Sequence, residues 1–154
     1  MRSNNRSAFL IVAAIVSGLL THGLLAQGPQ VYKARLSIVP IAGPANRATI
    51  DESATVFAAG NVTGTLNGSK LTVTGSFEGF KSPASIAQIH QGVAMGVRGP
   101  VVFDLTVTKA TKGTISGTFD LTPDQVNLLK NSRPYVQIHN ENTPEGALWG
   151  WFLK

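Results

Sequence analysis

The sequence predicts an all-β protein, either an antiparallel sandwich or a barrel, with one short helix. Several short segments alternate polar and apolar residues, and turns rich in glycine, asparagine and proline separate them. Many of these segments carry threonine or serine on one face, as expected when only one face of a sheet is buried. The 154 residues include 0 cysteines, so the fold must be held by its core without disulfides.

The N-terminus has the organisation of a secretory signal peptide. Residues 1–6 are basic and lack acids, residues 8–20 are uncharged and apolar, and Ala26 precedes a polar segment. An uncleaved membrane anchor is the alternative, and only through it would the chain contact a membrane. We therefore expect a leader over 1–26, a linker over 27–32, a domain over 33–153, and a secreted or periplasmic location.

The charge pattern argues against nucleic-acid binding. The formal net charge is +5, and removal of Arg2 and Arg6 with the leader leaves 11 basic against 8 acidic side chains, or +3. The remaining basic residues are scattered, without a basic stripe or interleaved aromatic residues. A solvated surface of mixed charge explains them better.

Alternation predicts most strands directly. Residues 40–50 read as a loop because they contain Gly43-Pro44, and residues 53–58 remain open between strand and loop. The predicted strands cover residues 31–39, 60–66, 71–77, 85–91, 101–108, 114–121, 135–140 and 147–153. In the fifth strand, Val101, Phe103, Leu105 and Val107 are expected to face inward.

Two local signals are sharper than the alternation. Asn67-Gly68 stands between two alternating strands and favours a type I′ hairpin turn, which needs two positive φ angles. Thr122-Pro123-Asp124-Gln125 combines a cap, a proline at the first helical position and a capping box. It predicts a short helix over 123–131, docked through Val126 and Leu129.

The chemistry-bearing residues gather around one stretch, Ile86 to Leu105. Its first strand ends in Gln88-Ile89-His90, and a second strand opens at Val101. The intervening loop carries Gly92, Gly96, Gly99 and Pro100. A later strand ends similarly in His139, and these are the only two histidines outside the leader.

These motifs resemble the CHRD domain, a family named for repeats in chordin and common in exported bacterial proteins. The resemblance runs from about Lys33 to Leu153 and includes the strand-to-helix segment and Tyr135-Val-Gln-Ile-His139. It implies an immunoglobulin-like β-sandwich, export and no established enzymatic activity. The chain departs from the family pattern at Gln88, Ala147 and Trp149. The motif positions that match the family are Gly92, Gly96, Gly99, Pro100, Gly146 and Gly150.

A metal site is the sharpest functional hypothesis. His90 and His139 could bind a divalent transition metal together with one carboxylate, and such a set would suit a metal carrier or a metal-dependent enzyme. The candidate carboxylates are Asp104, Glu141 and Glu145. Alternatively, both histidines are structural and bind backbone groups that fix the glycine-rich loop.

Other chemistry is poorly supported. Ser85, His90 and Asp104 do not lie in a nucleophile elbow, and the glycine loop lacks the features of a phosphate cradle. No catalytic residue and no further cofactor is therefore predicted. Trp149 and Trp151 share one face of the last strand, so they form either an exposed carbohydrate platform or part of a core.

The preferred interpretation is a non-catalytic binding or scaffold module. Its expected partner is another protein, including a component of the extracellular matrix. No feature of the sequence indicates an oligomeric state.

Overall fold

The computed structural model describes residues 28–38 and 57–154. The predicted leader over 1–26 and the predicted loop over 40–50 lie outside these ranges, as does most of the ambiguous segment 53–58. Among the described residues, no helix is long and apolar enough to cross a membrane.

The described residues form eight strands and one helix. Their order is β1 (Gln30–Ile38), β2 (Ala59–Asn67), β3 (Lys70–Glu78), β4 (Ala84–Gln91), β5 (Val101–Val107), β6 (Gly113–Asp120), α2 (Pro123–Lys130), β7 (Pro134–Asn140) and β8 (Thr143–Trp151). All strand pairs are antiparallel. The all-β prediction with one short helix is therefore confirmed.

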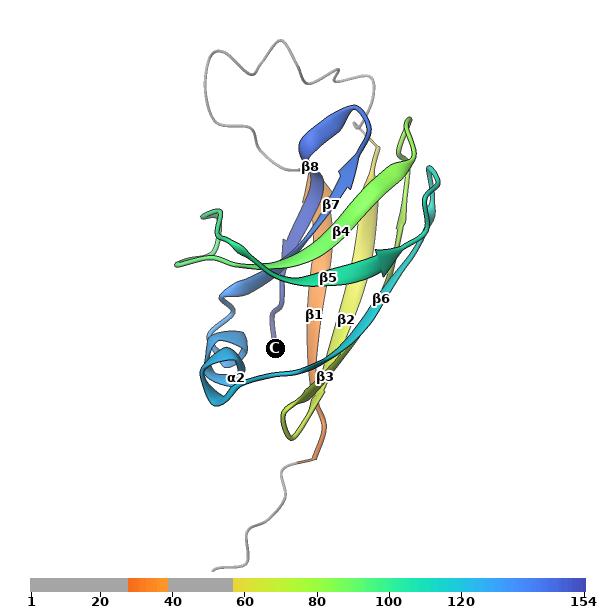
Figure 1. Cartoon of the computed structure of the whole chain (residues 1–154). Helices are drawn as coiled ribbons and strands as arrows, with labels where there is room; N and C mark the ends of the chain where they lie inside the picture. Colours follow the sequence, from red (N-terminus) through yellow and green to blue (C-terminus); the bar gives the residue numbers. More distant parts are fainter. Residues whose placement is uncertain (1–27, 39–56) are drawn as a thin grey trace, which may run out of the picture.

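The strands close into a barrel, in the order β1-β2-β3-β6-β5-β4-β7-β8. The immunoglobulin-like sandwich expected from the resemblance is wrong in this respect. Ser37 and Ile38 of β1 pair with β8, and Thr106 and Val107 of β5 pair with β6. Every strand therefore has a paired neighbour on both sides. Figure 1 shows β4 and β5 crossing over β1, β2 and β3 at a steep angle.

Closure follows from the cost of unpaired strand edges. An open edge leaves a row of backbone donors and acceptors without partners, and a closed barrel removes it. The two joins are short, with two facing residue pairs each. Between them lie two well-paired halves, β1-β2-β3-β6 and β5-β4-β7-β8.

The core lies inside the barrel and follows the predicted alternation. The largest fully buried side chains that share it include Tyr32, Phe152, Leu36, Ile89, Ile115, Ile138 and Leu148. Val101 is an exception because its side chain is 48% exposed, whereas Phe103, Leu105 and Val107 contribute to the core. A register shift between Ile89 and His90 disturbs the pairing of β4 with β5 where Val101 lies.

The hairpin between β2 and β3 is confirmed, but its turn type is not. Asn67 pairs with Lys70, so Gly68 and Ser69 form the turn. Among the non-glycine residues described, only Ser132 has a positive φ, and Gly68 has a φ of 61°. A type I′ turn needs two positive φ angles, whereas a glycine at the first position alone is typical of type II′.

The helix is confirmed together with its cap. Thr122 accepts a hydrogen bond from the Gln125 amide, and the Gln125 side chain accepts one from the Thr122 amide. Leu129 is buried and Val126 packs against the core. In Figure 1, α2 lies at the same end of the barrel as the β2–β3 turn.

Two boundaries differ from the sequence predictions. β1 begins at Gln30, so residues 30–32 belong to the barrel and not to the predicted linker. β8 begins at Thr143 and not at Ala147, because Asn140 pairs with Thr143 across a tight turn. Turn-forming residues such as Asn142 and Pro144 obscured this pairing in the sequence.

Candidate functional site

The two histidines lie on the outside of the barrel, on β4 and β7. Side chains alternate along a strand, so residues next to the core positions Ile89, Val136 and Leu148 point outward. Register pairs His90 with Tyr135 and Gln137 with Trp149. We call this outer surface the covered face, and it consists of Gln88, His90, Tyr135, Gln137, His139, Trp149 and Trp151.

Two segments cover this face. The first is the glycine loop, residues 92–100, between β4 and β5; the second is the residues around the β7–β8 turn. Arg98 of the glycine loop donates a hydrogen bond to the carbonyl oxygen of Glu145, at 2.9 Å. The Gln137 amide donates to the same oxygen, at 2.7 Å. The two covering segments are therefore tied to each other and to β7.

Backbone carbonyls hold both imidazole rings. The Nδ1 atom of His90 lies 3.0 Å from the carbonyl oxygen of Gly99, and that of His139 lies 2.8 Å from the carbonyl oxygen of Pro144. A carbonyl oxygen only accepts, so each Nδ1 carries the hydrogen. Each Nε2 of a neutral ring is then a free lone pair. Both Nε2 atoms are buried and have no hydrogen-bond partner among the described residues.

The rings lie close to each other and to a tyrosine. The centroids of His90 and His139 are 6.3 Å apart, and their planes are tilted by 33°. His90 stacks on Tyr135 at 5.0 Å, while the Tyr135 hydroxyl accepts a hydrogen bond from the Gly99 amide at 3.1 Å. The predicted pair of histidines is thus brought together in space.

The pKa of His90 is lowered. Burial is the main cause because it penalises the charged ring, and the nearby His139 and Arg98 also lower it. The hydrogen bond to Gly99 opposes these effects but does not cancel them. His90 is therefore neutral at pH 7, which leaves its Nε2 lone pair available.

The predicted carboxylate does not join the histidines. Asp104 accepts a hydrogen bond from the Gln88 amide at 2.8 Å. Within residues 28–38 and 57–154, no group of three or more histidine, aspartate or glutamate side chains is placed to hold a metal. Glu145 contributes its backbone carbonyl to the covered face, as described above. Only the histidine pair remains of the predicted ligand set.

The tryptophans form a second, smaller core on the covered face. Trp149 and Trp151 are only 8% and 9% exposed, and they cluster with Tyr135. The ring centroids of Tyr135 and Trp151 are 4.8 Å apart, and those of the two tryptophans 4.5 Å. The hypothesis of an exposed carbohydrate platform is therefore wrong. Its physical basis fails because these outward-facing side chains pack against each other and against Tyr135.

Two motif glycines shape the cover. A side chain at Gly99 would collide with the carbonyl of Gln91, and one at Gly146 would collide with the amide of Gln137. Gly146 also has a φ of 110°, which residues with side chains rarely adopt. These glycines let both covering segments approach the sheet closely enough to bury His90 and the Nε2 atom of His139.

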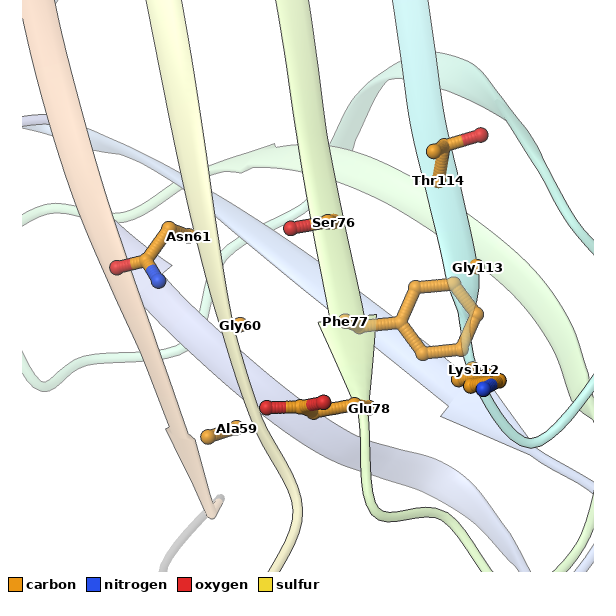
Figure 2. A pocket seen from close by; sticks show the side chains of 9 residues that line it. All are labelled: Ala59, Gly60, Asn61, Ser76, Phe77, Glu78, Lys112, Gly113 and Thr114. Carbon is orange, nitrogen blue, oxygen red and sulfur yellow. The ribbon is translucent and has the colours of Figure 1, made fainter.

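A separate depression of about 480 Å³ lies on the opposite half of the barrel. Figure 2 shows Asn61, Ser76, Glu78 and Thr114 around it, on neighbouring strands β2, β3 and β6. Gly60 and Gly113 line it as well. The depression contains none of the predicted site residues, and alternating strands of this composition gave no signal for it.

The comparisons with known proteins agree with the motifs. No curated protein and no solved structure matched the chain. A family model described as the CHRD domain matches residues 41–151, which is more than half of the sequence and includes the whole covered face. The chain belongs to the CHRD domain family.

Proposed function

We propose that this CHRD domain is an exported, non-catalytic binding module whose contact surface is the glycine loop. The observation that carries the proposal is the exposure of apolar side chains on a firmly anchored loop. Val93 and Met95 are 76% and 62% exposed, and Val97 is exposed as well. Apolar side chains that gather on an exposed surface often mark a site of interaction.

The loop is anchored at its base and bare at its tip. His90, Tyr135 and Glu145 bind its residues Gly99 and Arg98, while the Val97 amide binds the carbonyl of Ala94 within the loop. A loop that is already ordered loses less conformational entropy on binding than a free one. This arrangement favours recognition over a purely structural connection.

The side chains at the tip favour a protein partner, including a component of the extracellular matrix. Valine and methionine offer dispersion contacts and few hydrogen bonds, and methionine adapts to irregular surfaces. A polar glycan would leave these side chains poorly matched. Without its leader the chain has a net charge of +3, and its basic residues are scattered. They form no patch that would attract nucleic acid.

Export is supported by the leader motif. Mass spectrometry of the chain recovered from the producing cells tests it. We expect a secreted or periplasmic product that begins at Gln27, because Ala26 ends the predicted signal peptide. Recovery of the chain with an intact Met1 end from the cytoplasm would contradict export.

Site-specific photo-crosslinking in the producing cells tests the contact surface. A photo-reactive amino acid replaces Val93 or Met95 in one set of chains, and Thr72 or Thr118 on the outer face of β3 and β6 in a matched control set. These threonines are exposed too. We expect one discrete protein adduct from positions 93 and 95 only. Equal adducts from both sets, or none from positions 93 and 95, would overturn the proposal.

A further inference from the structure

We propose that His90 and His139 bind one Cu(I) ion between their Nε2 atoms. The inference goes beyond the proposed docking function, because it concerns the covered face beneath the glycine loop and requires no protein partner. It rests on the protonation of the two rings, their separation and the chemistry of their surroundings.

Protonation comes first. Both Nδ1 atoms donate to backbone carbonyls, so both Nε2 atoms present lone pairs within the covered face. A buried acceptor without a partner is destabilising, because it has lost its hydrogen bonds to water without replacing them. Two such nitrogens on neighbouring rings are unusual in a folded protein, and one cation that accepts both lone pairs removes both penalties.

The separation of the rings fits a shared ion. Metal–nitrogen bonds to imidazole are about 2.0–2.1 Å long, so two rings on opposite sides of one ion have centroids roughly 6 Å apart. The centroids of His90 and His139 are 6.3 Å apart. A tetrahedral angle at the metal would bring the two centroids roughly 1 Å closer. The observed distance matches the linear arrangement more closely than the tetrahedral one, for rings whose Nε2 atoms face the shared ion.

The surroundings select the ion. Calcium and magnesium need six or more oxygen ligands, and zinc needs three or four protein ligands. The described residues place no third histidine or carboxylate beside the pair. Cu(I) is satisfied by two neutral nitrogen ligands, and its single charge is cheaper to bury than a double one. Tyr135, stacked on His90, adds an aromatic surface that tolerates a monovalent cation.

The carbonyl groups that would orient the two metal-binding rings are already in place. Metal-binding histidines commonly donate their other ring hydrogen to a backbone carbonyl, which fixes the tautomer and the ring orientation. Gly99 and Pro144 supply these carbonyls from the two covering segments. Because Arg98 and Glu145 tie those segments together, the two rings are held by one connected framework.

Anaerobic titration of Cu(I) into the purified full chain, against a chromogenic Cu(I) chelator, tests the proposal. We expect one ion per chain, and we expect His90→Gln and His139→Gln each to weaken binding by at least about 100-fold. Thr118→Ala, on the exposed outer face of β6 and outside the covered face, is the control; it should leave the affinity unchanged. No competition with the chelator, or binding that survives both substitutions, would overturn the site.

A second measurement remains decisive if either variant fails to fold. In the unsubstituted chain, two-bond proton–nitrogen spectra report each ring nitrogen separately. Addition of diamagnetic Cu(I) should shift the Nε2 resonances of His90 and His139 and leave both Nδ1 hydrogens in place. Unchanged Nε2 resonances at one equivalent of Cu(I) would refute the proposal without any substitution. X-ray absorption should then show two nitrogen neighbours in the loaded protein.

Discussion

The two halves of the barrel share one core but differ on their outer faces. In the half formed by β1, β2, β3 and β6, each strand pairs with its neighbour without interruption. In the other half, the pairings of β4 with β5, β4 with β7 and β7 with β8 each contain a register shift. The regular half exposes threonine and serine, whereas the irregular half buries histidine, tyrosine and tryptophan.

The two halves differ in their strand pairing: the regular half continues the sheet without interruption, and the irregular half carries the candidate site. Unbroken alternation gives a plain outer face, which we call the threonine face and which consists of Thr72, Thr74, Ser76, Thr114, Ser116 and Thr118. Irregular pairing redirects side chains and is frequent next to functional sites. The covered face needs this irregularity because its loops must come down onto the sheet. The proposed binding surface lies on the irregular half.

The largest expected contrast is between two outward-facing positions. Trp151→Ala should destabilise the protein by about 3–5 kcal/mol, because the ring is buried against Tyr135 and Trp149. Thr74→Ala, on the threonine face, should change the free energy of unfolding by less than about 0.5 kcal/mol. Urea unfolding of both variants measures the contrast. Similar small losses in both would show that the covered face is not a second core.

A smaller contrast separates two glycines with positive φ. Gly146→Ala should cost about 3 kcal/mol, because the φ of 110° is strained for alanine and the new carbon meets Gln137. Gly68→Ala should cost only about 1–2 kcal/mol, since its φ of 61° is tolerated better and no atom lies within 4 Å of an added carbon. Thermal unfolding ranks the two variants. A larger loss at Gly68 would contradict the tight cover.

The loop anchor should have a moderate effect. Tyr135→Phe removes the hydroxyl that accepts from the Gly99 amide, at a cost of about 1–2 kcal/mol. The rate of amide hydrogen exchange at Gly99 should increase in the variant. The rate at Val73, in the regular half, should change only as much as the overall loss of stability requires. Slow exchange at Gly99 in the variant would mean that other contacts hold the loop.

The smallest expected effect is a pH dependence from His90. Burial lowers the pKa of the folded ring, whereas the unfolded ring titrates near about 6.5. The unfolded chain therefore binds the proton first, and the stability that this group contributes is complete above about pH 6.5 and declines as the pH falls below it. Between pH 7 and 5, the free energy of unfolding should fall less steeply with decreasing pH in His90→Gln than in the unsubstituted protein. An identical slope would assign the dependence to other groups.

Local features were predictable from the sequence, and long-range ones were not. The capping box at Thr122 depends on four consecutive residues, so it was predicted with its hydrogen bonds. The turn at Gly68 was displaced by one residue, because the pairing of Leu66 with Leu71 sets its register. Alternation is the same in a sandwich and a barrel, so closure through Ser37 and Thr106 left no trace in the pattern.

The candidate site was predictable only in part. The histidines stood out because they end two similar strands. Binding of the rings to backbone groups was one of the two alternatives that the sequence left open, but nothing in the sequence identified Gly99 and Pro144 as those groups or showed that Trp149 would be buried. The ring contacts span only 9 and 5 residues, but the bonds of Arg98 to Glu145 and of Gly99 to Tyr135 span 47 and 36 residues and depend on the finished barrel.

The most direct test of the covered face is the protonation of its two histidines. A two-bond proton–nitrogen spectrum at pH 7, recorded without added metal, identifies the tautomer of each ring. The structure predicts hydrogen on Nδ1 and a free lone pair on Nε2 for both His90 and His139, because each Nδ1 faces a carbonyl. Hydrogen on Nε2 of either ring would contradict the carbonyl anchors and remove the basis of the proposed copper site.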